Sequence, residues 1–224
     1  MISFQRVYKR YPNGREALSE LSFDLASGEM AFLTGHSGAG KSTVLKLIAL
    51  LERPTRGQVV VNGVGTSKVS RRHIPPFRRQ VGVVFQDHRL LTDRPVYDNV
   101  ALPLVISGAP RREMDKRVRA ALDQVGLLGK ETSFPTELSA GEQQRVGIAR
   151  AVIAKPPVLI ADEPTGNLDP DLALEVMNVF KRLNDVGVTV LVATHDVHVI
   201  ERLRIRRIHI EQGRLAGVPP DVAA

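Results

Sequence analysis

Short apolar runs alternate along the chain with longer segments in which apolar residues recur every three or four positions. Runs of strand length lie within "SGEMAFLTG", "GQVVVNG", "RQVGVVFQD", "PVLIAD" and "VTVLVATHD". The run in "PVLIAD" is continuously apolar, as expected of a strand that is covered on both faces. The segment "RRIHIEQGRLAG" alternates and turns at Gly213, which predicts a hairpin at the edge of the sheet.

Helices are predicted between these strands. The segment "GKSTVLKLIALLERP" follows a strand and is expected to end at Pro54. Two further segments, "RREMDKRVRAALDQVGL" and "DLALEVMNVFKRLNDVG", show helical periodicity with charged residues on the opposite face. The apolar faces comprise Met114, Val118, Ala121, Leu122 and Val125 in the first, and Leu172, Val176, Val179, Phe180 and Leu183 in the second.

Strands that alternate with helices predict an α/β fold with a mainly parallel core sheet and an antiparallel β edge region. A mostly helical stretch interrupts the alternation. We therefore expect one domain, with a core from about 1–86 and 156–217, a helical subdomain at about 87–155, and a loose tail at 218–224. The length of 224 residues and the hydrophobic fraction of 43% fit one compact domain.

Composition narrows the classes of function. The net charge is +7, but the basic residues form only short clusters, so nucleic acid is not an expected partner. These clusters are Arg71–Arg72, Arg78–Arg79, Arg111–Arg112 and Arg206–Arg207. The absence of cysteine excludes disulfides and Cys-ligated zinc, and it favours a reducing cytosol. The longest apolar runs fall short of the ~20 residues that span a bilayer. Work at a membrane would therefore need another chain.

A glycine-rich loop is the strongest chemical signal. The segment "GHSGAGKS" matches the pattern G-x-x-x-x-G-K-[ST] and lies between a predicted strand and a predicted helix. Gly35, Gly38 and Gly40 allow the backbone to curl so that its N–H groups point at phosphate oxygens. Lys41 is expected to reach the β- and γ-phosphates, and Ser42 to ligate Mg²⁺. The alternative is a turn that only caps a helix.

Polar side chains follow three other predicted strands. Asp162 and Glu163 end the apolar run "VLIADE", His195 ends "LVATHD", and Gln86 ends "VGVVFQ". Because ligands bind at the carboxyl ends of parallel strands, these residues are expected to meet at one edge. Asp162 then suits the Mg²⁺ side, and Glu163 suits a general base for the attacking water. Adjacent acids that merely cap a loop are the alternative.

Taken together, the motifs resemble the nucleotide-binding domains of the ATP-binding-cassette family. The motifs "GHSGAGKS", "LSAGEQQR", "VLIADE" and "GNLD", together with Gln86 and His195, stand in the family's order and spacing. The resemblance covers residues 2–217. It implies an ABC-type P-loop NTPase with a RecA-like core, ATP and Mg²⁺ as cofactors, and a homodimer that encloses two ATP molecules.

The resemblance also implies roles for individual residues. Catalysis falls to Glu163, His195 and Gln86. The metal site falls to Ser42, Gln86 and Asp162. The expected ATP contacts are Tyr11, which stacks on adenine, and Gly35, His36, Ser37, Gly38, Ala39, Gly40, Lys41, Ser42 and Thr43.

The segment "LSAGEQQR" lies about a hundred residues after the phosphate loop. The resemblance implies that it faces the ATP of a second subunit, through Ser139, Ala140, Gly141 and Glu142. Asp169, in "GNLD", is expected at the seam between subunits. Ala140 stands where the family usually has glycine. Its methyl group carries a cost if that position needs a positive φ or a very close approach to phosphate.

Three sequence segments indicate which branch of the family the chain resembles. "FQDHRLLTDRPVYDNVALPL", "GEQQRVGIARAV" and "ADEPTGNLD" resemble the branch with mechanotransmission-type partners, above all the bacterial cell-division ATPases. This implies an integral membrane partner that controls cell-wall hydrolases, a peripheral location at the cytoplasmic face of the inner membrane, and a link to cytoskeletal division proteins.

Several alternatives remain open. One is the ATPase of a lipoprotein-release or macrolide-efflux transporter. Another is an ATP-gated docking protein for division proteins, although intact Glu163 and His195 argue against lost catalysis. Soluble cassettes of DNA repair or translation carry long insertions, zinc ligands or two cassettes, none of which is visible. The membrane partner's helix is expected to contact apolar residues after Gln86, which otherwise form the core of the insertion: Leu90, Leu91, Val96 and Tyr97.

Overall fold

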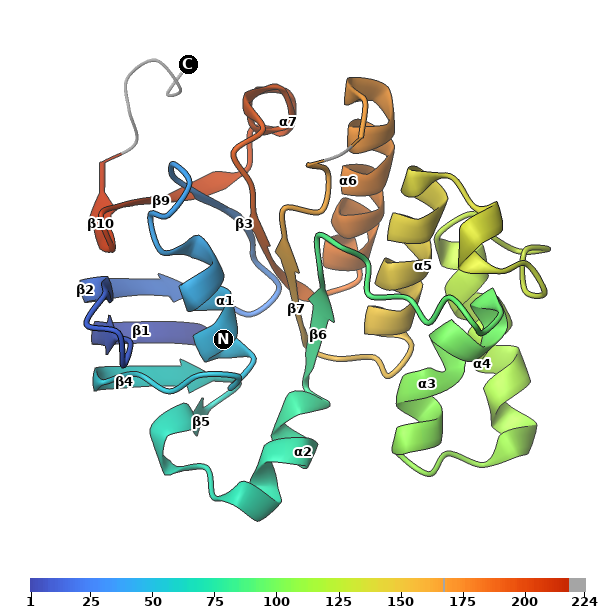
Figure 1. The fold of residues 1–224 in the computed structure, drawn as a ribbon, viewed down its shortest axis with the longest axis horizontal. Helices are drawn as coiled ribbons and strands as arrows, with labels where there is room; N and C mark the ends of the chain where they lie inside the picture. Colours follow the sequence, from blue (N-terminus) through green and yellow to red (C-terminus); the bar gives the residue numbers. More distant parts are fainter. Residues whose placement is uncertain (167, 218–224) are drawn as a thin grey trace.

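Two β-sheets and a group of helices make up the fold (Figure 1). The computed structural model describes residues 1–166 and 168–217, so the expected loose tail at 218–224 lies outside the described residues. None of the helices in these two ranges is both long and apolar enough to span a membrane.

The larger sheet has six strands in the order β10-β9-β3-β8-β7-β6. Strands β9, β3, β8, β7 and β6 are parallel, and β10 pairs antiparallel with β9 at the edge, which confirms the predicted hairpin. Their bounds are β3 (Met30–Thr34), β6 (Val81–Val84), β7 (Val158–Asp162), β8 (Thr189–Ala193), β9 (Arg206–Glu211) and β10 (Arg214–Ala216).

The antiparallel region is a sheet of its own, with the order β2-β1-β4-β5. Its strands are β1 (Ile2–Arg10), β2 (Glu16–Leu25), β4 (Arg56–Val61) and β5 (Val64–Gly65). Sequence analysis assigned neither β1 nor β2. The pairing of these two strands shifts register at several places between Phe4 and Arg10, and such bulges interrupt the alternation that a flat strand would show.

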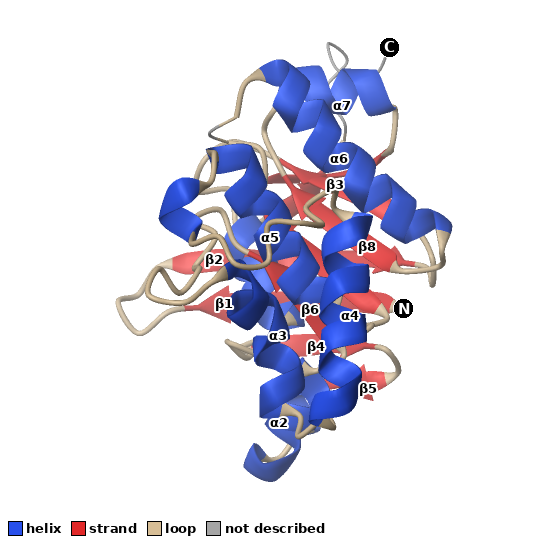
Figure 2. Cartoon of the chain, turned by 90° about the vertical axis from the view of Figure 1, so that its right-hand side faces the viewer, coloured by secondary structure: helices blue, strands red, loops and turns tan. Residues whose placement is uncertain are grey.

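The helices are α1 (Lys41–Ile48), α2 (Ile74–Arg78), α3 (Val96–Ile106), α4 (Arg111–Gln124), α5 (Ala140–Val152), α6 (Pro170–Asp185) and α7 (Val197–Leu203). The expectation that the first helix continues to Pro54 is wrong. Leu50 has a φ of 52°, in the left-handed region, so the chain leaves the helix well before the proline. Helices α3 to α6 lie on the viewer's side of the sheets in Figure 2.

The six-stranded sheet is buried on both faces, which explains its continuous apolar runs. Phe32, Leu159 and Val192 belong to the core beneath α3 to α7. Their neighbours Leu33 and Ile160 belong to a second core, which also contains α1 and the antiparallel sheet. The predicted inward positions of α4 and α6 are confirmed as buried, except that Met114 and Leu172 are only half-buried.

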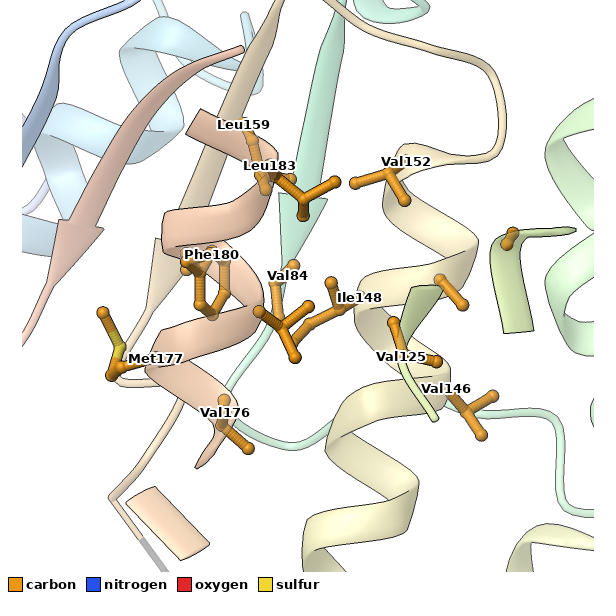
Figure 3. Close-up of a cluster of buried hydrophobic side chains, with 14 of the residues drawn as sticks. Val84, Val125, Val146, Ile148, Val152, Leu159, Val176, Met177, Phe180 and Leu183 are labelled. Atoms are coloured by element: carbon orange, nitrogen blue, oxygen red, sulfur yellow. The ribbon is translucent and has the colours of Figure 1, made fainter. Parts of the chain in front are cut away.

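Phe180 on α6 is fully buried between the sheet and the neighbouring helices (Figure 3). We expect Phe180→Ala to lower the free energy of unfolding by about 3–5 kcal/mol, because it removes a large apolar side chain and leaves a cavity. Urea denaturation of the purified protein measures this. Val186→Ala is the matched control, since Val186 is 76% exposed and its truncation is expected to change little. An equal loss in both variants would contradict the core assignment.

Candidate functional site

A cavity of about 700 Å³ lies where the loops after β3, β6, β7 and β8 meet the turn between β1 and β2. It therefore lies at the carboxyl ends of parallel strands, as expected for a ligand site in an α/β sheet. Most of the residues expected from the sequence to bind a nucleotide come together here. Its lining comprises Tyr11, Asn13, Arg15, His36, Ser37, Gly38, Gly40, Lys41, Ser42, Thr43, Lys46, Gln86, Asp162, Glu163 and His195.

The glycine-rich loop between β3 and α1 has a backbone conformation that only glycine can adopt at two positions. Gly35 and Gly40 have φ values of 144° and 116°. A Cβ on Gly35 would lie 2.2 Å from the carbonyl oxygen of Ile210, and a Cβ on Gly40 would lie 2.8 Å from that of Ala17. Helix α1 begins directly after Gly40 with no side-chain cap. Its first N–H groups and its dipole therefore face the cavity as an anion site.

Lys41 is held inside this loop. Its ammonium group donates hydrogen bonds to the carbonyl oxygens of Gly35 at 2.7 Å and His36 at 3.3 Å. Its Nζ also lies 3.5 Å from Oε1 of Glu163, and the Lys41 side chain is only 8% exposed. A fixed, largely desolvated cation at the start of a helix favours the binding of a polyanion.

Asp162 and Ser42 face each other across the cavity floor. The Ser42 hydroxyl donates to Oδ1 of Asp162 at 3.2 Å. Burial raises the pKa of Asp162; the Ser42 hydrogen bond opposes that rise and the charge of Glu163 adds to it. The described residues contain no cluster of three or more His, Cys, Asp or Glu that could hold a metal alone. One carboxylate and one hydroxyl instead fit Mg²⁺, which takes few protein ligands when phosphates supply the others.

Glu163 lies between two other residues of the site. Its Oε2 is 2.7 Å from Nδ1 of His195, while its Oε1 faces Lys41. The backbone of Glu163 is left-handed, with a φ of 49°, and its N–H donates to the carbonyl oxygen of Ala193 in β8. A strained backbone that the neighbouring strand holds in place is frequent at functional sites. The arrangement provides a largely buried carboxylate with a fixed orientation.

Gln86 lies exposed just after β6 and lines the same cavity, beside the strand that carries Asp162. Its amide is the neutral member of the polar set at this edge. The four strand-end residues that the sequence singled out therefore lie around one cavity: Gln86, Asp162, Glu163 and His195.

Tyr11 stands in the turn after β1. Its hydroxyl oxygen is 3.3 Å from Oγ1 of Thr43, and Nζ of Lys9 lies 5.0 Å from the centre of its ring. Sequence analysis missed three residues of the lining: Asn13, Arg15 and Lys46. Arg15 donates from Nη2 to the carbonyl oxygen of Gly38 at 3.5 Å. The signal available for Asn13 and Arg15 was their place in the same turn as Tyr11.

Two expected ATP contacts do not line the cavity. Gly35 contributes its carbonyl oxygen to Lys41, as described above. Ala39 is 1% exposed and its methyl group packs in the core with α1. Its carbonyl oxygen accepts a hydrogen bond from the Gly213 N–H at 2.9 Å. These two residues therefore shape the loop, and the neighbouring loop residues form the cavity wall.

The segment Ser139 to Glu142 lies at the start of α5 and does not line the cavity of its own chain. The Ser139 hydroxyl accepts from the Glu142 N–H at 3.3 Å, and Oε2 of Glu142 accepts from the Ser139 N–H at 2.9 Å. The latter hydrogen bond lowers the pKa of Glu142. Gly141 is buried, whereas Ser139 and Ala140 are exposed. Ala140 is helical and has no positive φ, so only close approach to a ligand could make its methyl group costly.

Asp169 caps α6 by accepting from the Leu172 N–H at 3.1 Å, and it is exposed outside the cavity. Residue 167 of the same motif lies outside the described residues. The expected apolar contact surface after Gln86 is wrong in part. Val96 is fully buried, and Leu90 and Tyr97 pack against the core, so only Leu91, at 41% exposure, is largely open to solvent.

The chain is similar to known proteins over almost its whole length. It is 55% identical over 217 residues to the cell division ATP-binding protein FtsE of Escherichia coli strain K12, which covers 97% of this chain and 98% of that protein. It is 46% identical over 213 residues to FtsE of Bacillus subtilis strain 168, which covers 95% and 93%.

Solved structures of ABC transporter cassettes are also similar to this chain over almost its whole length. The dimeric structure of MJ0796, a bacterial ABC transporter cassette, superposes with a TM-score of 0.87 at 34% identity and covers 97% of both chains. A post-hydrolysis dimer of the same cassette, bound to ADP and Pi, has a TM-score of 0.87 at 33% identity. The ABC transporter family matches residues 18–166. The chain therefore belongs to the ABC transporter family, as an ATP-binding domain and ATPase of that family.

Proposed function

We propose that two copies of this chain enclose two ATP molecules, hydrolyse them, and thereby drive an FtsX-like integral membrane protein in bacterial cell division. The chain would work at the cytoplasmic face of the inner membrane, where that partner holds it. One observation carries the enzymatic part of this proposal. The Glu163 carboxylate lies between Lys41 and His195 in a cavity that also contains a helix N-terminus.

Nucleotide binding follows from the cavity. The N–H groups of the glycine-rich loop and the start of α1 receive the phosphates, and Lys41 moves from loop carbonyls to phosphate oxygens. The Tyr11 ring at the cavity edge stacks on the base. Ser42 and Asp162 would hold Mg²⁺, which would supply charge neutralisation on the phosphates. Gln86 would be the neutral member of the same ligand set.

Hydrolysis needs a base for the attacking water, and Glu163 is the only glutamate that lines the cavity among the described residues. Its close contact with His195, 2.7 Å from Oε2 to Nδ1, fixes the side-chain direction. Lys41 and the loop N–H groups stabilise the charge that develops on the γ-phosphate. His195 is 69% exposed, which lets it also reach the phosphate that leaves.

A second copy completes the site. Helix α5 presents the exposed Ser139 hydroxyl and a capped N-terminus away from its own cavity. A helix N-terminus with a serine is an anion site, so it suits the γ-phosphate bound in another subunit. Two-fold symmetry makes both sites equivalent. The dimeric structures of the related cassette support this arrangement.

The cell-division role is supported by relatives at 46–55% identity that carry the FtsE name and align over nearly their whole length. Their name favours division over lipoprotein release or efflux. ATP-driven closure and opening of the dimer would pass through the membrane partner to cell-wall hydrolases outside. Cytoskeletal division proteins are a further candidate partner on the cytoplasmic side.

Lys41→Ala is expected to abolish ATP binding, because it removes the buried cation that the carbonyl oxygens of Gly35 and His36 hold inside the cavity. Binding of a fluorescent ATP analogue to the purified protein measures this. Lys181→Ala serves as the control, since Lys181 is exposed on α6 outside the cavity and its loss is expected to have no effect. Unchanged affinity in Lys41→Ala would rule out the phosphate-loop role.

Glu163→Gln is expected to bind ATP and to accumulate as a dimer, because the base is lost while the neutral amide keeps the shape. Size-exclusion chromatography with light scattering, with and without ATP, measures this. Adding Ser139→Arg to this variant should abolish the dimer and leave ATP binding intact, because Ser139 lies outside its own cavity. A Glu163→Gln protein that binds ATP and stays strictly monomeric would contradict the enclosed-dimer proposal.

The ATP-bound Glu163→Gln protein, captured from native membranes and analysed by mass spectrometry, tests the biological role. We expect an FtsX-like membrane protein to be recovered together with a cell-wall hydrolase. The Glu163→Gln/Ser139→Arg protein is the control, because a partner that senses the closed dimer should be depleted from it. Recovery of lipoprotein-release or efflux subunits would overturn the division role and leave the ATPase site unaffected.

A further inference from the structure

The positive charge of the chain is concentrated in one segment. Residues 53–86 contain no Asp or Glu and seven of the 31 Lys and Arg residues. The rest of the chain therefore has 24 basic residues against 24 acidic ones, so the whole net charge of +7 belongs to this segment. The phosphate cavity does not account for it, because Gln86 is the only residue of the segment in the cavity lining.

Five of these cations have exposed side chains that take part in no side-chain hydrogen bond or ion pair with any other residue of 1–166 and 168–217: Arg56, Lys68, Arg71, Arg72 and Arg79. Four of them lie within residues 68–79. We call residues 68–79 the basic segment. Unpaired cations of one sign repel each other, so the segment is charged beyond what the fold itself uses.

The basic segment has a fixed shape. Arg53 donates to the carbonyl oxygens of Thr66 at 2.9 Å and Ser67 at 2.8 Å, which holds the chain just before the segment. Inside it, the buried side chains of Val69 and Phe77 anchor the backbone in the core. The cations are therefore displayed on an ordered surface, so binding through them costs little ordering entropy.

An apolar tip lies at the same end of the molecule. The turn between α3 and α4 reaches the end at which α2 lies in both Figure 1 and Figure 2. Val105 and Ile106, which end α3, are 58% and 67% exposed, and Arg111 and Arg112 begin α4 after residues 107–110. Apolar side chains next to unpaired cations match the headgroup region of a membrane, where both find favourable surroundings.

We propose that the basic segment binds the surface of anionic phospholipids directly. This rests on the proposed function, because it assumes that the chain works beside a membrane. The chemistry favours lipid over nucleic acid. Within 53–86 Phe77 is buried and Phe85 is half-buried, so the segment offers no exposed Phe, Tyr or Trp ring for stacking on bases. The exposed imidazole of His73 is held by a 2.8 Å hydrogen bond between its Nδ1 and the Ser70 hydroxyl. The exposed apolar side chains of Val105 and Ile106 would gain nothing from contact with a charged nucleic-acid backbone.

Such a contact orients the ATPase as well as concentrating it at the membrane. Each Lys or Arg near an anionic surface strengthens binding about fivefold, and salt weakens the attraction. Four unpaired cations thus supply a contact of moderate strength that a membrane partner can reinforce. The cavity that holds the nucleotide lies at the other ends of the parallel strands, because α2 immediately precedes β6 whereas Gln86 follows it. Lipid contact therefore leaves the cavity free.

Sedimentation with vesicles tests the proposal in the absence of any membrane partner. The full-length protein is expected to bind vesicles that contain about one third phosphatidylglycerol in phosphatidylcholine, to lose that binding in high salt, and to ignore pure phosphatidylcholine. Arg71→Gln/Arg72→Gln is expected to lower the partition coefficient roughly 30-fold, as two lost cations imply. Lys181→Gln/Arg202→Gln removes the same charge from exposed sites on α6 and α7, across the sheet, and should bind like the parent.

Three results would overturn the proposal: no binding to phosphatidylglycerol vesicles, equal binding to neutral vesicles, or an equal loss in both double variants. Binding of an RNA or DNA duplex without binding of vesicles would also overturn it and assign the surface to nucleic acid. ATP hydrolysis by the same proteins is measured alongside and should be equal in both variants. Failure to hydrolyse ATP counts against the proposed function, whereas failure to bind vesicles counts only against the lipid contact.

Discussion

The contact of the Glu163 carboxylate with Lys41 on one side and His195 on the other joins three loops that are far apart in the sequence. It works because β3, β7 and β8 are parallel neighbours, so the loops that follow them leave the sheet at one edge. The left-handed backbone of Glu163, tied to Ala193, turns its side chain into the cavity. A change in sheet order would separate the charges and leave the cavity without the Glu163 carboxylate.

The sheet can position these groups only because both of its faces are covered. One core lies beneath α3 to α7 and the other contains α1 and the antiparallel sheet. The same layering places the N-terminus of α5, with Ser139 and Glu142, outside the cavity of its own chain. In a single chain, therefore, the N-terminus of α5 and the cavity, which we propose bind the same phosphate in a dimer, do not meet. A two-fold dimer is the simplest arrangement that brings them together.

The cavity and the basic segment differ in how charge is distributed. Lys41 and Lys46 face the cavity with Asp162 and Glu163, so the site combines both signs and its groups stabilise one another. The basic segment has no acidic counterpart, although it is as firmly anchored in the core. The cavity can thus bind its ligand through groups at fixed positions. The basic segment, which we assign to an anionic membrane surface, depends more on the number of its cations than on their spacing.

Local patterns determined the strands of the large sheet, the helices α4 and α6, and the residues Lys41, Ser42, Asp162 and Glu163, because periodicity and short motifs are local properties. Bulges concealed β1 and β2. The early end of α1, the inward turn of Val96 and the cavity places of Arg15 and Lys46 were decided only by tertiary structure. Each depends on which distant backbone or core surface lies opposite, and a one-dimensional pattern does not contain that information.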